Sequence, residues 1–66
     1  MAKILIIDDS TFEANHVKSL LEEMGHEVFW AETGGRGIKI IKLDRPDLVI
    51  LDLVLPDISG LEICRW

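Results

Sequence analysis

Short apolar runs of strand length alternate along this chain with segments whose apolar residues recur at helical spacing. The runs are rich in β-branched, leucine and aromatic residues, which favour strands. Strands alternating with helices imply right-handed crossovers and a parallel sheet. We therefore expect an α/β fold in the order β-α-β-α-β-α. The expected strands are 3–8, 27–31 and 47–52, and the expected helices are 10–24, 35–43 and 59–66.

Capping residues mark where these helices begin and end. Ser10 followed three residues later by Glu13 forms the capping-box pattern, in which the Ser side chain accepts a hydrogen bond from a backbone N–H one turn on. The same pattern recurs at Ser59 and Glu62. Gly25 is suited to end the first helix in a left-handed conformation.

Several features that could suggest a binding site are interpreted as structural. The stretch "GGRG" at 34–37 could cradle phosphate, but it does not match the dinucleotide-binding pattern and does not follow the first strand. We interpret it as a frayed helix start, capped by Thr33. His16 and His26 lack a partner at metal-ligand spacing and are interpreted as solvated surface residues, and Trp30 as a packing residue.

Carboxylates stand at the ends of two expected strands. If the crossovers wind in opposite directions about the first strand, the strand order is 2-1-3, and the carboxyl ends of strands one and three flank a switch point where ligands bind. The first strand ends in Asp8 and Asp9, and the third ends in Asp52. Strands about 4.8 Å apart would bring these side chains into one crevice.

Three carboxylates in one crevice repel, so either one is protonated or a cation lies among them. Mg²⁺ fits best, because it takes one or two carboxylates, keeps several waters and shares its remaining positions with phosphate oxygens. An Asp in such a crevice can also form an acyl phosphate as a covalent nucleophile. The alternative is that Asp8 and Asp9 only cap the following helix and that Asp52 only begins a turn.

Length and charge limit the remaining possibilities. The chain of 66 residues forms at most one domain, 1–66, with a marginal core. The lone Cys64 excludes an internal disulfide, which leaves a metal or a partner for added stability. A net charge of −5 with scattered basic residues argues against direct nucleic-acid binding. No apolar run has the length of a membrane span or a signal peptide, so we expect a soluble, cytoplasmic protein.

The motifs "ILIIDDS" and "PDLVILDLVLPDISGLE" together resemble the receiver domain of bacterial two-component response regulators, a flavodoxin-like fold. The resemblance implies that Asp52 is the phospho-acceptor, that Asp9 binds Mg²⁺ directly and that Asp8 binds it through water. It also implies that the backbone carbonyl of Val54 is the third protein ligand. A partner histidine kinase would supply the phosphoryl group. We expect a signalling module and not an enzyme.

The chain matches only the first half of such a domain. A complete receiver has five strands, with a Ser or Thr ending the fourth and a Lys ending the fifth, and neither strand is found in 1–66. Lys3, Lys39 and Lys42 cannot be assumed to replace that Lys. The resemblance therefore implies a partial receiver that binds Mg²⁺, is weakly phosphorylated by small phosphodonors and lacks normal output.

The third strand is expected to have a free edge. Its apolar character on both faces suits an interior strand, and a bare apolar edge favours pairing with another chain. We expect a symmetric homodimer through strand three, Leu48 to Leu53, and helix three, with the strand order 2-1-3-3-1-2. A different swap between two copies stays open. A second hypothesis is a self-associating half-domain whose aspartates are idle and which has no signalling activity.

Overall fold

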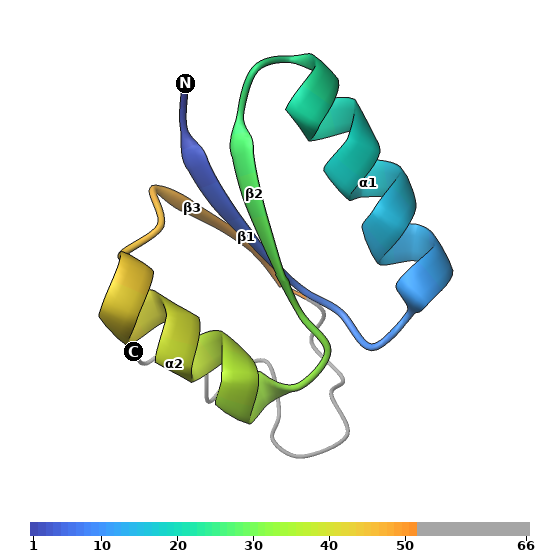
Figure 1. Ribbon diagram of the computed structural model, residues 1–66. Coiled ribbons are helices and arrows are strands. Elements are labelled where there is room, and N and C mark those ends of the chain that lie inside the picture. The colour runs from blue at the N-terminus through green and yellow to red at the C-terminus, as the bar shows by residue number, and fades with distance from the viewer. Residues whose placement is uncertain (52–66) are drawn as a thin grey trace.

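The structure, a computed structural model, describes residues 1–51. The expected third helix at 59–66 and the expected end of the third strand at Asp52 lie outside the described residues. Within 1–51, no helix combines the length and apolar character needed to cross a membrane. The described elements are β1 (Lys3–Ile7), α1 (Thr11–Glu23), β2 (Glu27–Ala31), α2 (Gly34–Asp44) and β3 (Leu48–Leu51), shown in Figure 1.

The three described strands form a parallel sheet in the order β2-β1-β3, which confirms the expected order. β1 lies in the centre. On one side Ile6 pairs with Trp30, and on the other side Ile7 pairs with Leu51. β1 therefore aligns the carboxyl ends of both neighbouring strands with its own.

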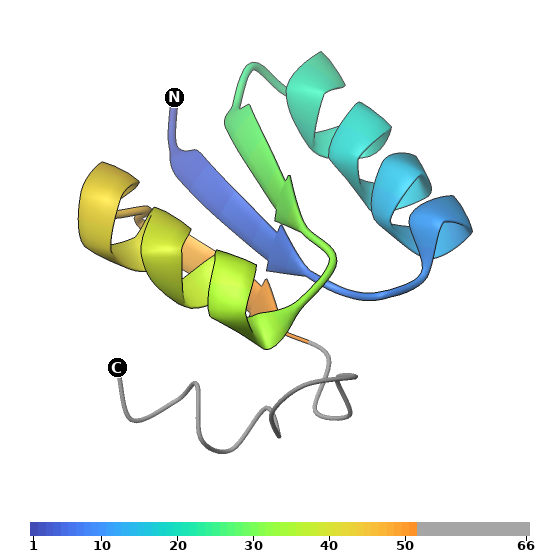
Figure 2. The same cartoon turned by 60° about the horizontal axis from the view of Figure 1, so that its bottom comes forward.

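The two helices pack on opposite faces of this sheet, as Figures 1 and 2 show. Ile6 and Val28 contact Ala14 of α1 on one face, whereas Leu5 and Ile7 face α2 on the other. All four residues from Ile4 to Ile7 are buried. β1 is apolar throughout its buried length because both of its faces lie inside the protein.

The helix ends follow the expected capping. The Ser10 side chain accepts a hydrogen bond from the Glu13 N–H, and the Thr33 hydroxyl accepts one from the Arg36 N–H at 3.2 Å. Gly25 has φ +88°, and its N–H donates to the Glu22 carbonyl at 3.0 Å. These bonds satisfy backbone groups that a helix end leaves unpaired.

The amino end of β1 is tied to both of its neighbours. The backbone N–H of Lys3 donates to Asp47 Oδ2 at 2.8 Å, and the N–H of Asp47 donates to the Lys3 carbonyl at 2.7 Å. The N–H of Ala2 donates to Nδ1 of His26 at 3.1 Å. The interpretation of His26 as a solvated surface residue was therefore wrong, because its imidazole is half-buried and holds the chain before β1.

Glycines at the start of α2 allow the helix to approach β1 closely. Gly34 and Gly37 are buried, so the segment is not a frayed end. A Cβ added at Gly37 would lie 2.8 Å from Cγ1 of Ile7 and closer still to its Cδ1. Ile7 is itself fully buried and has little room to move. The close contact between α2 and the central strand thus favours glycine at this position, because any Cβ would force the Ile7 side chain to shift.

We expect Gly37→Ala to lower the free energy of unfolding by about 1 kcal/mol. Overpacking costs about 1–3 kcal/mol, and the better helix propensity of Ala returns about 1 kcal/mol. Chemical denaturation measures the change. Gly35→Ala is the matched control, since Gly35 is exposed on the same helix and should tolerate the methyl group.

A double variant tests the cause. Ile7→Val removes the Cδ1 that the new methyl group would strike, so the combined loss in Gly37→Ala with Ile7→Val should be smaller than the sum of the single losses. Additive losses would contradict steric contact as the reason.

Candidate functional site

Asp8 and Asp9 lie directly after β1, at the edge of the sheet where all three described strands have their carboxyl ends. Asp8 is half-buried and Asp9 is exposed. Ser10, the next residue, is the N-cap of α1, so the pair also lies at the positive end of a helix dipole. Asp8 and Asp9 thus lie at the edge of the sheet where the sequence predicts them, whereas their expected juxtaposition with Asp52 stays a prediction because Asp52 lies outside the described residues.

Three hydrogen bonds hold Asp8. Its N–H donates to the carbonyl of Ala31 at 3.1 Å, which extends the β1–β2 pairing past the end of β1. Its Oδ1 accepts from the N–H of Ser10 at 2.9 Å, and its backbone carbonyl accepts from Nε1 of Trp30 at 2.9 Å. Both the side chain and the backbone of Asp8 are therefore oriented before any ligand arrives.

The hydrogen bond from Trp30 to the acidic segment was not predicted from the sequence. We interpreted it as a packing residue, and its ring does pack on the α1 side of the sheet, but its N–H also reaches the acidic segment. The signal that could have revealed it is the strand register. Trp30 pairs with Ile6, two residues before Asp8, so the three residues share one face of the sheet.

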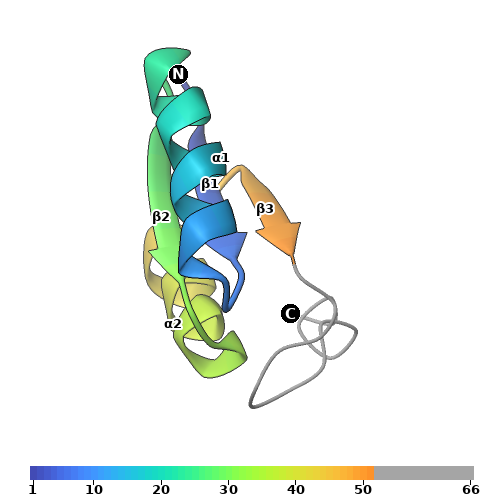
Figure 3. The same ribbon diagram turned by 90° about the vertical axis from the view of Figure 1, so that its right-hand side faces the viewer.

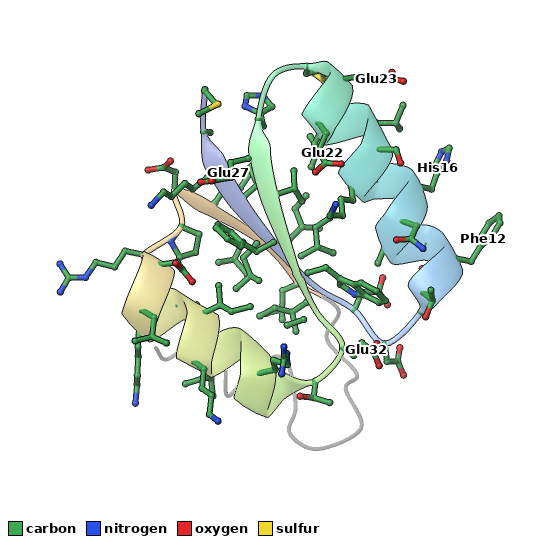
Figure 4. All side chains as sticks on the ribbon, in the orientation of Figure 1. Phe12, His16, Glu22, Glu23, Glu27 and Glu32 are labelled. Carbon is green, nitrogen blue, oxygen red and sulfur yellow. The ribbon has the colours of Figure 1, made fainter. Side chains whose placement is uncertain are left out.

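A hollow lies at the end of β2 and the start of α2. It has a volume of about 450 Å³ and is lined by Trp30, Glu32, Thr33 and Arg36. Figure 4 shows Glu32 at the turn between β2 and α2, on the same edge of the sheet. Trp30 thus both lines this hollow and donates a hydrogen bond to the acidic segment.

The other expected site residues are Asp52 and Val54, and both lie outside the described residues. What the structure does describe is the strand that precedes them. Leu51, the last residue of β3, pairs with Ile7, the last residue of β1. The next residue of each segment is an aspartate, Asp52 after β3 and Asp8 after β1.

The chemistry of the acidic pair fits a hard divalent cation. Two carboxylates provide oxygen ligands of the kind and number that Mg²⁺ takes from a protein. Within residues 1–51, neither Asp8 nor Asp9 has a basic partner within ion-pair distance, and no group of three or more metal-ligating side chains is found. The described residues therefore place two carboxylates at this edge with no basic side chain within ion-pair distance of either.

Comparison with known proteins agrees with this arrangement. The model of the response regulator receiver domain matches residues 4–66. Protein PilH of Pseudomonas aeruginosa is 42% identical over 65 residues, which cover 98% of this chain and 54% of that protein. The polar-differentiation response regulator DivK of Brucella anthropi is 30% identical over 63 residues, covering 96% of this chain and 51% of that protein.

Solved structures share the fold. The response regulator receiver domain protein from Clostridium thermocellum has a TM-score of 0.92 and 39% identity, covering 98% of this chain and 53% of that chain. The chemotaxis response regulator CheY4 of Vibrio cholerae has a TM-score of 0.92 and 33% identity, covering 96% and 52%. The chain thus spans about half the length of these relatives. It belongs to the response regulator receiver domain family of two-component signalling.

Proposed function

We propose that this chain is the phospho-accepting part of a receiver, with Asp52 as the phospho-acceptor. The observation that carries the proposal is the pairing of Leu51 with Ile7. Because these residues are neighbours across the sheet, we infer that the aspartates that follow them lie at the same edge of the sheet. This supports a common crevice for Asp52 and Asp8.

We propose that the crevice binds Mg²⁺ through Asp8, Asp9, Asp52 and the backbone carbonyl of Val54. Support comes from the oxygen atoms of the acidic pair, from the lack of a basic partner for either carboxylate within residues 1–51, and from the hydrogen bonds that fix Asp8. When bound, Mg²⁺ would neutralise charge on the phosphoryl oxygens. Family membership adds the expectation of a histidine kinase as phosphoryl donor.

In the proposed reaction, a carboxylate oxygen of Asp52 attacks the phosphorus of a phosphorylated histidine. A P–O bond forms, the P–N bond breaks, and the departing imidazole keeps the electron pair and takes up a proton. The role of Asp8 and Asp9 is to hold the cation that offsets repulsion between the attacking carboxylate and the phosphoryl group. Ser10 contributes by holding Oδ1 of Asp8 in place.

We further propose that β3 pairs with a second copy of the chain in an antiparallel arrangement. Within residues 1–51, β3 is hydrogen-bonded to β1 alone. Leu48 is 53% exposed and Ile50 is 37% exposed. Figure 3 shows the cause, since α1 lies over β1 and β2 and leaves β3 to one side. An apolar strand with a free edge favours such pairing.

This exposed edge also favours the second candidate function, a self-associating half-domain in which the aspartates are idle. The two candidates differ in chemistry. The first requires Mg²⁺ binding and phosphorylation at Asp52, whereas the second requires only association.

We expect Mg²⁺ to bind the wild-type chain and Asp9→Asn to weaken binding by more than about tenfold, because loss of a direct ligand should exceed the 10–100-fold effect of losing an outer-shell partner. Isothermal titration calorimetry measures the affinity. Asp47→Asn is the matched control. It removes the same charge at the opposite end of the sheet, and its amide oxygen can still accept the Lys3 N–H.

Phosphorylation is tested on the same proteins with acetyl phosphate and Mg²⁺. Mass spectrometry should find one added phosphoryl group on the wild type and on Asp47→Asn, and none on Asp52→Asn. Unmodified wild-type protein, with no Mg²⁺ bound, would favour the second candidate.

We expect Leu48→Lys to raise the dissociation constant of the homodimer by about tenfold or more, because a charged side chain on an edge strand opposes strand pairing. Sedimentation velocity over a concentration series measures the association. Phe12→Lys is the control, since Phe12 is 85% exposed and points away from the sheet on the outer side of α1 (Figure 4). A wild-type chain that stays monomeric throughout the series would contradict the dimer.

A further inference from the structure

The indole of Trp30 makes a polar contact with the acidic segment across 22 positions of sequence. An indole has one donor and no acceptor, so its hydrogen bond has a single direction. In this protein the acceptor is the backbone carbonyl of Asp8, at 2.9 Å from Nε1. The ring is half-buried against α1, which limits its movement.

This bond controls the peptide that joins the two carboxylates. The carbonyl of Asp8 and the N–H of Asp9 lie in one rigid plane, so holding the carbonyl oxygen fixes the orientation of the whole peptide. The preceding N–H of Asp8 is already held by the carbonyl of Ala31. Residues of β2 thus fix the backbone on both sides of the Asp8 Cα atom, and this sets the direction in which the chain continues to Asp9.

We propose that Trp30 is a positioning residue for the metal site, and that its indole N–H raises the affinity of the Asp8–Asp9 pair for a hard divalent cation. The inference rests on the proposed Mg²⁺ site. Ligands that are already oriented lose less freedom when the cation binds, so affinity depends on the groups that hold them. Trp30 does not touch the cation in this role and acts through the peptide alone.

The experiment compares Mg²⁺ affinity in the wild type, Trp30→Phe and a chain synthesised with benzothienylalanine at position 30. The last variant keeps the shape of the indole but has sulfur in place of its N–H, so it removes the donor with little change in packing. We expect both changes to weaken Mg²⁺ binding about tenfold in isothermal titration calorimetry.

Phe29→Leu is the matched control. Phe29 precedes Trp30 on β2 but packs on the opposite face, against the cluster of Leu5, Ile7 and Ala31. The Phe29→Leu substitution should reduce packing against the sheet without changing any contact of the acidic segment. The Mg²⁺ affinity should therefore stay within about twofold of the wild type. Equal weakening in Phe29→Leu would overturn the positioning role, because it would assign the effect to general loss of packing.

NMR spectroscopy tests the reverse effect, that of Mg²⁺ binding on the indole hydrogen bond of Trp30. If the indole bond favours the cation, the cation must favour the indole bond by the same factor. Mg²⁺ should therefore shift the ¹H–¹⁵N resonance of the Trp30 indole, with the dissociation constant found by calorimetry. A Trp66→Phe background leaves Trp30 as the only indole, and Asp9→Asn should abolish the shift.

The outcomes separate this inference from the proposed function. Normal Mg²⁺ binding by the wild type, with unchanged affinity in both position-30 variants, would overturn the role of Trp30 and leave the metal site standing. No Mg²⁺ binding by the wild type would overturn the metal site and this role together.

Discussion

The parallel pairing of β1 with a strand on each side is the interaction on which the rest of the described structure depends. It pairs the backbone of β1 on both edges and leaves two apolar side-chain faces, each of which one helix covers. It also sets where each neighbouring strand ends. Because Ile7 is aligned with both Ala31 and Leu51, the three described strands end at one edge of the sheet.

The orientation of Asp8 depends more on the pairing of β1 with β2 than on the residues next to Asp8 in sequence. Only the bond from Ser10 to Asp8 is local. The other two come from the end of β2, through the Ala31 carbonyl and the Trp30 indole. A shift of the β1–β2 register by one residue would carry Trp30 to the other face and remove its bond, whereas the capping of α1 would survive. The position of the acidic pair is therefore coupled to the sheet.

Sequence reasoning succeeded where the cause is local. Strand composition, helix caps at Ser10 and Thr33, and the acidic pair after β1 could all be identified within a few residues. It failed where the cause joins distant segments. The need for glycine at Gly37 arises from Ile7, the burial of His26 from the chain before β1, and the polar role of Trp30 from Asp8. Each of these contacts depends on the strand register or on how closely two distant segments approach each other, and neither can be predicted from one segment alone.

The two proposed properties of the chain have different physical supports. The groups that orient Asp8 all come from Ser10, Trp30 and Ala31, within the described residues. Orientation of the acidic pair therefore requires no contact with the half of its relatives that this chain does not span. The exposed side of β3 is the opposite case, because within residues 1–51 nothing pairs with its outer edge. The bonds that orient Asp8 are thus complete within a single copy, while burial of Leu48 and Ile50 requires a further segment or a second chain.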